Sequence, residues 1–318
     1  MTDLPKRIEI HEEGPREGFQ IEAGPISTAD KVRFCEALAE TGLHDVQCVS
    51  FVDARRVPGM ADAVEVAQTI RQRPDVQYTG IALNLRGYER AVQTPLHITG
   101  GIQMSTSNTF SIHNTNKNNE ETLIEQRRQL DFFKARAIPV ESAIVMTAFG
   151  CNFEGEIAPE TVRDCVGKLL DLAGEYDISL DRVRIADTVG WASPASVQRV
   201  VGTIRERWPD LKLGLHLHDT RGTGMANALM GLQMGIASFD SSCAGLGGCP
   251  FAGHKGAAGN ICTEDLVFMA HEMGIETGID LDNLIECARM VEDIVGHPLP
   301  GKVMHGGSLS KYRGGVHP

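Results

Sequence analysis

Short apolar segments rich in β-branched residues alternate with amphipathic segments along the whole chain. The apolar segments are four to eight residues long, the length of buried strands, and they predict strands at 7–11, 45–51, 77–83, 97–104, 140–147, 182–186, 213–217 and 238–243. The amphipathic segments carry apolar residues at helical spacing, as at 28–41, 120–137, 159–176 and 194–208. This alternation is typical of repeated strand–helix units that build a parallel sheet.

The number of units decides the architecture. Eight strands with their crossover helices close a (β/α)8 TIM barrel, and a chain of 318 residues has the length that one such barrel needs. Helix caps are expected at Ser27-Thr28, Ser193-Pro194 and Thr263-Glu264-Asp265. We therefore predict a single domain over 1–318, with the barrel at about 6–280, an additional C-terminal helix at 281–295 and a loop from Gly296 onward.

Charge and composition narrow the class of partner. The net charge of −12 and the pI near 5.4 argue against nonspecific binding to nucleic acid or to an anionic membrane, since either requires a basic face. The N-terminus lacks an apolar signal core, and no stretch approaches the ~20 apolar residues that span a bilayer. The eight cysteines include no CxxC pair, so most are expected to be reduced and buried. We expect a cytoplasmic protein that acts on a small molecule.

The strongest local signal for chemistry is His216-Leu217-His218 at the end of the seventh predicted strand. Alternate residues of a strand point to the same side, so the two imidazoles project together, and the chemistry of a barrel gathers where its strands end. Two polar residues hydrogen-bonded in the barrel interior are the alternative interpretation. Placed at a barrel mouth, the pair forms half of a metal site.

Oxygen ligands to complete that site are available on neighbouring strands. Glu17 follows the first strand and Asn260 follows the eighth, and these strands become neighbours when a barrel closes. A hard divalent cation such as Mg²⁺ or Mn²⁺ prefers such oxygen ligands. Taken singly, Glu17 also fits a solvated loop carboxylate, and Asn260 also fits a turn residue or a helix cap before Thr263.

A glycine-rich segment, 241–260, follows the eighth strand and ends at Asn260. Its glycines permit backbone conformations that other residues avoid, and a mobile lid would bring Cys249 over the metal as a proton donor or acceptor. A buried structural thiol and a phosphate cradle are the alternatives. The phosphate interpretation is weak because the segment has no GxxxxGK[ST] motif.

Several motifs together resemble the 3-hydroxy-3-methylglutaryl-CoA lyase family, over about 8–279. They are Gly14-Pro15-Arg16-Glu17-Gly18-Phe19-Gln20, Ser50-Phe51-Val52 with Val57-Pro58-Gly59-Met60-Ala61-Asp62, Gly150-Cys151 with Glu154-Gly155, Asp187-Thr188-Val189-Gly190, His216-Leu217-His218-Asp219-Thr220, and the segment from Ala244 to Pro250. The HxHDT motif and the Ala-Gly-Leu-Gly-Gly-Cys-Pro lid are the most specific of these.

The resemblance implies a metal-dependent carbon–carbon lyase and assigns roles to its residues. The cation would chelate the substrate's 3-hydroxyl and a neighbouring oxygen, and its ligands would be Glu17, His216, His218 and Asn260. Arg16 would hold the enolate oxygen, Cys249 would protonate the enolate carbon, and Asp187 would position the hydroxyl proton or share it with His216. A barrel-mouth salt bridge is the alternative for Arg16, and an interior hydrogen-bond acceptor is the alternative for Asp187.

Further residues are expected to contact the substrate. They are Gln20, Gln47, Ser107, His254 and Lys255. His254 and Lys255 also fit solvated residues at the tip of a loop. By resemblance alone, we expect a homodimer.

The chain departs from the family at several positions. The lyases carry aspartate where this chain has Glu17, glutamate where it has Gln47, and another acid at Asn108. The lid is about two residues longer, and the region of Gly296-His297-Pro298 lacks the Asn and Lys that the family uses near CoA. With two carboxylates replaced by neutral amides, a less negative pocket favours a substrate with an additional carboxylate or a different arrangement of hydroxyl and acid groups.

The resulting prediction is a Mg²⁺- or Mn²⁺-dependent lyase that cleaves a 3-hydroxy-3-methylglutaryl-CoA-like thioester, or a relative such as citramalyl-CoA or a non-CoA hydroxy acid, to an acyl-CoA and a keto acid. A Claisen-type synthase is the second interpretation, although such synthases usually add C-terminal domains. A noncatalytic relative that binds metal or metabolite is the third.

Overall fold

The computed structural model of the chain describes residues 4–248 and 258–313. Within these ranges, eight parallel strands form one sheet in the order β3-β2-β1-β8-β7-β6-β5-β4. The strands are β1 (Glu9–Glu12), β2 (Asp45–Ser50), β3 (Gln77–Ile81), β4 (Gly100–Ser105), β5 (Val140–Met146), β6 (Arg182–Ala186), β7 (Leu213–His216) and β8 (Ser238–Ser241). All eight overlap the strands predicted from the sequence.

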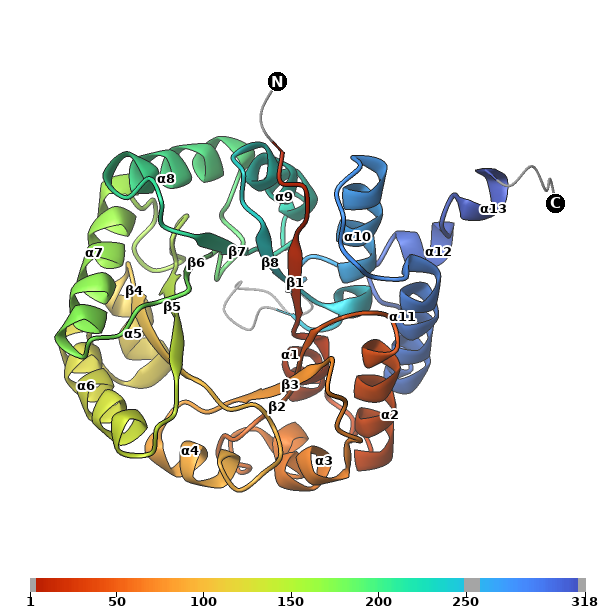
Figure 1. Cartoon of the computed structure of the whole chain (residues 1–318), viewed down its shortest axis with the longest axis horizontal. Coiled ribbons are helices and arrows are strands. Elements are labelled where there is room, and N and C mark those ends of the chain that lie inside the picture. The colour runs from red at the N-terminus through yellow and green to blue at the C-terminus, as the bar shows by residue number, and fades with distance from the viewer. Residues whose placement is uncertain (1–3, 249–257, 314–318) are drawn as a thin grey trace.

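The sheet closes between its two outer strands, β3 and β4. A parallel bridge joins Thr79 of β3 to His97 just before β4, and the backbone N–H of His97 donates to the carbonyl oxygen of Tyr78 at 2.8 Å. Figure 1 shows the strands around the centre of the molecule with the helices as an outer ring. The predicted TIM barrel is therefore confirmed.

Helices follow the strands around this ring. They are α1 (Gly14–Ile21), α2 (Thr28–Ala39), α3 (Ala63–Thr69), α4 (Leu85–Ala91), α5 (Asn108–Thr115), α6 (Asn119–Ala135), α7 (Pro159–Glu175), α8 (Pro194–Arg207), α9 (Gly224–Gln233) and α10 (Thr263–Glu272), with 3-10 turns η1 (Pro58–Met60) and η2 (Cys243–Gly245). Among the helices of the described ranges, none has the length and apolar character to cross a membrane.

The C-terminal part differs in one respect from the prediction. Helix α11 (Leu281–Val295) has the predicted bounds and packs against α2 and η2. The tail beyond Gly296 was predicted as loop, which is wrong for two short helices, α12 (Val303–Gly306) and α13 (Ser310–Arg313). Helices of four residues are too short for their periodicity to be recognised in a sequence.

Two of the three predicted helix caps are confirmed. Ser27 accepts from the backbone N–H of Asp30 at 3.0 Å, and Ser193 accepts from that of Ser196 at 3.3 Å. Thr263 begins α10 but does not cap it, because its hydroxyl donates to the buried carboxylate of Glu12 at 2.5 Å.

The strands divide their side chains between two environments. On β6, Val183 and Ile185 are fully buried under the surrounding helices, whereas Arg182 and Arg184 line a cavity inside the barrel. A period of two explains this division, since alternate residues of a strand point to opposite faces. The apolar core therefore lies between the sheet and the helices, while the barrel interior carries polar side chains.

Candidate active site

Helix α1 places Arg16 and Glu17 at the mouth of the barrel. The sequence predicted a strand-end loop here, and the structure has a helix, which begins with Gly14 and Pro15 immediately after β1. Proline suits the first turn of a helix, where its missing N–H has no partner to lose. Gly14 is required because a Cβ there would lie 2.6 Å from Glu12 Oε1, which accepts the Gly14 N–H at 2.8 Å.

Three predicted metal ligands converge at this mouth. Ligand atoms of Glu17, His216 and His218 lie within 4.8 Å of one another. The two Nε2 atoms of the histidines are 3.1 Å apart, and Glu17 Oε1 lies 4.0 Å from His218 Nε2. Residues separated by about 200 positions in the chain thus face a common point.

Asn260 joins them from the segment that follows the glycine-rich loop. It pairs with His218 in an antiparallel bridge, and its Nδ2 donates to Glu17 Oε2 at 2.9 Å. Its Oδ1 is buried and has no hydrogen-bond partner among the residues that the structure describes. A buried oxygen without a donor fits a ligand of a cation.

Arg16 is held on three sides. Its Nη2 lies 3.0 Å from Glu13 Oε2 and 3.3 Å from Glu17 Oε2, and its Nε donates to Gln47 Oε1. Gln47 precedes a register shift in β2 between Gln47 and Val49, and such bulges commonly re-aim side chains near active sites. The predicted site residues Arg16 and Gln47 are thus in direct contact.

Two residues that the sequence analysis missed complete the cluster, Glu13 and Asp240. Asp240 Oδ2 lies 3.2 Å from His216 Nδ1, and Glu13 Oε2 lies 3.5 Å from the same nitrogen. A carboxylate on the second nitrogen of a metal-binding histidine fixes the orientation of the ring. Asp240 pairs in register with His216 on the neighbouring strand β7, a relation that the pattern of β8 alone does not contain.

Arg184, also missed, balances the charge of Asp240. Its Nε donates to Asp240 Oδ1 at 2.8 Å, across the intervening strand β7. Gly214 of β7 lies between them, and a Cβ at Gly214 would be 3.4 Å from Arg184 Cγ. A larger residue at 214 would therefore crowd the ion pair.

The charges around the cluster shift the pKa values of the two histidines in opposite directions. Burial lowers the pKa of His216, but the hydrogen bond to Asp240 and the charges of Glu13 and Glu17 reverse this and raise it to about 9. Burial and the charge of His216 lower the pKa of His218 to about 4. Burial raises the pKa of Glu17, yet Arg16 and His216 bring it to about 2. A neutral His218 and an ionised Glu17 have the lone pairs that a metal requires.

Asp187 lies directly after β6, and only one of its two carboxylate oxygens has hydrogen-bond partners among the described residues. Oδ1 accepts from the backbone N–H groups of Trp191 at 2.7 Å and Ala192 at 3.0 Å, while Oδ2 is buried without a hydrogen-bond partner in the described part of the chain. The backbone N–H of Asp187 donates to the carbonyl oxygen of His216. Burial raises the pKa of Asp187 to about 6.

The other predicted substrate contacts are more scattered. Gln20 lies one turn beyond Arg16 on α1, and its Oε1 is buried without a hydrogen-bond partner among the described residues. Ser107 caps α5 and accepts from the Cys151 thiol at 3.2 Å, so its hydroxyl has partners within the fold. Cys249, His254 and Lys255 lie outside the described residues.

Two buried carboxyls hold the start of the glycine-rich loop. Glu12 Oε1 accepts from the backbone N–H of Cys243 and Glu264 Oε2 from that of Ala244, both at 2.9 Å. Ala244 has a positive φ of 61°, which is unfavourable for alanine. Burial raises the pKa of Glu12 to about 7 and that of Glu264 to about 8.

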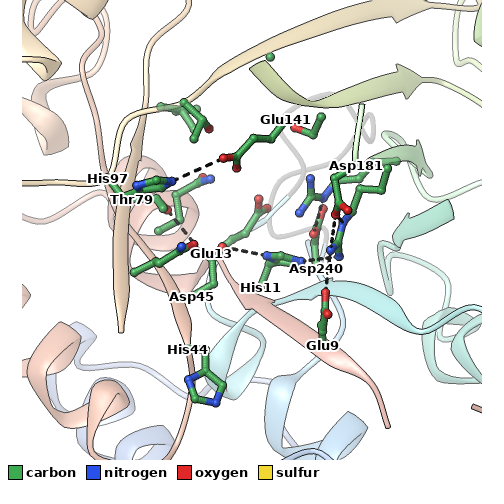
Figure 2. Close-up of a pocket in the computed structure, with 18 of the residues that line it drawn as sticks. Glu9, His11, Glu13, His44, Asp45, Thr79, His97, Glu141, Asp181 and Asp240 are labelled. Atoms are coloured by element: carbon green, nitrogen blue, oxygen red, sulfur yellow. Dashed lines mark hydrogen bonds and ion pairs between the residues drawn. The ribbon is translucent and has the colours of Figure 1, made fainter. Parts of the chain in front are cut away.

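A cavity of about 730 Å³ extends from this cluster through the barrel interior. Arg16, Gln47, His216 and Asp240 line one end of it, and polar residues of several strands line the remainder. Figure 2 shows His11, Glu13, Asp45 and Asp240 around this space. A polar, hollow interior differs from the layers of branched aliphatic side chains that usually fill a TIM barrel.

Residues 7–291 match the model of a protein family described as HMGL-like. The chain belongs to the HMGL-like family. Within it, the chain is 38% identical over 303 residues to the hydroxymethylglutaryl-CoA lyase YngG of Bacillus subtilis, a match that covers 94% of this chain and 96% of that protein.

Solved structures of HMG-CoA lyases have the same fold. The structure of the Bacillus subtilis enzyme superposes with a TM-score of 0.87 at 36% identity, covering 95% of this chain and 98% of that one. That of the HMG-CoA lyase of Acinetobacter baumannii, in complex with coenzyme A and 3-methylmalate, has a TM-score of 0.86 at 33% identity and covers 100% and 99%. The predicted family and enzyme class, a carbon–carbon lyase, are confirmed.

Proposed function

We propose that this HMGL-like lyase cleaves a 3-hydroxyacyl-CoA similar to 3-hydroxy-3-methylglutaryl-CoA into an acyl-CoA and a keto acid, with Mg²⁺ or Mn²⁺ bound. The observation that supports this most is the convergence of Glu17, His216, His218 and Asn260 beside Arg16. The names of its relatives as HMG-CoA lyases and the coenzyme A bound to the Acinetobacter baumannii enzyme support the substrate class. A homodimer is proposed on the resemblance alone, and light scattering tests it.

The donor set fits a hard divalent cation. Glu17 and Asn260 offer oxygens, and His216 and His218 offer their Nε2 atoms. When bound, the cation polarises the substrate's 3-hydroxyl and a neighbouring oxygen. Asp240 orients His216 through Nδ1, so that Nε2 faces the site.

The side chains around the metal ligands are proposed to transfer the protons and to bind the enolate. Asp187 Oδ2, buried and without a partner among the described residues, takes the hydroxyl proton or shares it with His216. The C2–C3 bond then breaks as C3 becomes a ketone, and the departing electron pair forms an enolate. Arg16, whose Nη1 makes no hydrogen bond to the described residues, donates to the enolate oxygen. Cys249 is proposed to return a proton to C2.

The experiment is an assay of product identity with a panel of thioesters. Purified enzyme with Mn²⁺ or Mg²⁺ is incubated with each thioester and with its free acid, and the products are identified by mass spectrometry. Acetyl-CoA and acetoacetate from methylglutaryl-CoA support the proposal. Activity with a 2-oxo acid and acetyl-CoA in the reverse direction would favour a synthase, and no reaction in either direction would favour a binding protein.

Two variants connect the activity to the site. His218→Ala should abolish turnover and weaken Mn²⁺ binding, whereas His305→Ala, on an exposed residue outside the cavity whose Nε2 lies 3.9 Å from Glu292 Oε2, should change neither. Cys249→Ser should lower kcat and leave KM close to the wild-type value, as expected for a proton-transfer residue. Unchanged turnover in His218→Ala protein would remove the histidine pair from the mechanism.

A shorter hydroxy diacid is the second candidate for the acyl group. The 3-methylmalate bound to the Acinetobacter baumannii lyase favours it, as does the neutral amide of Gln47 beside Arg16. Citramalyl-CoA would yield acetyl-CoA and pyruvate, and the thioester of 3-methylmalate at the carboxyl next to the methyl-bearing carbon would yield propionyl-CoA and glyoxylate. The same panel separates these outcomes by their products.

A further inference from the structure

The barrel interior contains an arginine with free donors. Arg184 lines the cavity, and its Nε is occupied by Asp240, whose side chain is only 2% exposed. Its two Nη groups make no hydrogen bond to any residue in the part of the chain that the structure describes. Five N–H donors in a planar fork make arginine suited to bidentate binding of a carboxylate.

The acids that line the interior are already paired. Asp45 Oδ2 lies 3.0 Å from His11 Nδ1, Glu13 is held by Arg16, and Asp240 is held by Arg184. The other interior arginine, Arg182, uses Nε and both Nη groups in hydrogen bonds. The groups of Arg184 that remain available are therefore hydrogen-bond donors, and a ligand that binds them must offer acceptor atoms.

Space for that ligand continues from His216, one of the proposed metal ligands, down to Arg184. The cavity of about 730 Å³ includes Arg16, His216 and Arg184 in one continuous lining. Arg184 pairs in register with Gly214, two residues before His216 on β7, and this places its Cα about 7 Å along the barrel from that of His216. Gly101 on β4, two strands away from Arg184, also lines the cavity and leaves space there, because a Cβ at Gly101 would meet nothing closer than 3.6 Å.

We propose that this cavity is a subsite for the acyl chain, in which Arg184 binds a terminal carboxylate that lies farther from the 3-hydroxyl than in methylglutaryl-CoA. The inference rests on the proposed lyase function and names its substrate class as 3-hydroxyacyl-CoA thioesters of longer dicarboxylic acids. The reaction remains the same: the C2–C3 bond breaks, the hydroxyl proton passes to the base, C2 takes up a proton, and acetyl-CoA leaves with a methyl keto acid two carbons shorter than the acyl group.

The test uses the CoA thioesters of 3-hydroxy-3-methyl-glutaric, -adipic, -pimelic and -suberic acids. Acetyl-CoA release by the metal-loaded full chain gives kcat/KM for each, and the readout is the ratio of each longer substrate to methylglutaryl-CoA. In the wild type, at least one longer substrate should exceed methylglutaryl-CoA by tenfold or more. Arg184→Gln should lower that ratio at least tenfold, and Arg184→Lys should lower it by less.

Two further variants separate the subsite from a general disturbance of the barrel. Arg127→Gln removes an arginine that pairs with Glu175 outside the cavity, so the ratio should stay within threefold of the wild type. Gly101→Val keeps Arg184 but fills the cavity, so it should lower the ratio as Arg184→Gln does. If Arg184→Gln protein fails to fold, Arg184→Lys and Gly101→Val still decide the question.

A binding measurement distinguishes failure of the subsite proposal from failure of the proposed lyase function. In chelator-treated protein, free pimelate should raise the melting temperature of the wild type and not that of Arg184→Gln or Arg184→Lys. Cleavage of methylglutaryl-CoA without any preference for length, or a preference that survives both changes at Arg184, would overturn the subsite and leave the lyase function standing. Pimelate binding that depends on Arg184, in a protein that cleaves no thioester, would overturn the lyase function and leave the subsite.

Discussion

Glu264 should make the stability of the barrel fall as the pH rises. Its side chain is fully buried, Oε2 accepts one backbone N–H from Ala244, and Oε1 has no hydrogen-bond partner among the described residues. Burial raises its pKa from 4.5 to about 8. The folded state thus holds this proton more tightly than the unfolded state, so the stabilisation is present at low pH and is lost as pH rises through 8.

The magnitude follows from the shift in pKa. Between pH 5 and pH 8 each unit removes about 1.4 kcal/mol, so Glu264 costs about 4 kcal/mol over this range, and nothing further is lost above it. In Glu264→Gln the neutral amide still accepts the Ala244 N–H at every pH. The variant should match the wild type to within about 1 kcal/mol at pH 5 and exceed it by about 4 kcal/mol at pH 9.

Urea unfolding followed by circular dichroism at pH 5, 6, 7, 8 and 9 measures this difference. Glu12, whose pKa is also raised, remains in both proteins, so subtraction isolates Glu264. Glu286→Gln on α11 is the control, because that side chain is 68% exposed and its removal should change stability by less than about 1 kcal/mol at any pH. A difference between Glu264→Gln and the wild type that is constant from pH 5 to pH 9 would refute the reasoning.

Three further changes test other parts of the structure. Asp240→Asn removes the carboxylate 3.2 Å from His216 Nδ1 and should weaken Mn²⁺ binding, measured by calorimetry, by about 10- to 100-fold. Gly18→Ala places a Cβ 2.2 Å from Leu246 Cγ, so it should cost about 1–3 kcal/mol in urea unfolding and lower kcat, since α1 carries Arg16. Ser27→Ala removes a helix cap far from the cavity and should lower stability by about 1 kcal/mol with kcat unchanged, which a parallel assay checks.

The strands could be predicted because their outward faces follow a local rule. Val183 and Ile185 alternate with polar residues, and burial against helices requires apolar side chains at such positions wherever the strand lies in the barrel. Helix α1 could not be found in this way. Gly14, Pro15 and Gly18 suggest a turn, whereas the structure uses the two glycines for close approach to Glu12 and Leu246.

The predicted cluster and the missed residues differ in what their positions depend on. Glu17 and His218 were found because strand ends meet at one mouth of a barrel, a property of the fold class as a whole. The pairing of Arg184 with Asp240 depends on strand register and on the absence of a side chain at Gly214, neither of which a single strand's pattern contains. Contacts between non-adjacent strands can therefore be identified only once the arrangement of the whole sheet is known.

The pairing of the first strand, β1, with the last, β8, bears on how an active molecule is made. Glu17 follows the first strand and Asn260 follows the last, and β1 pairs with β8 over four residues. A chain in which this seam is still open lacks the four-residue cluster, even if all its other strand pairs have formed. If the natural termini were joined and the chain were opened between β4 and β5 instead, 216–260 and 13–17 would follow each other in the middle of the new chain, and the cluster would no longer require the first strand to pair with the last.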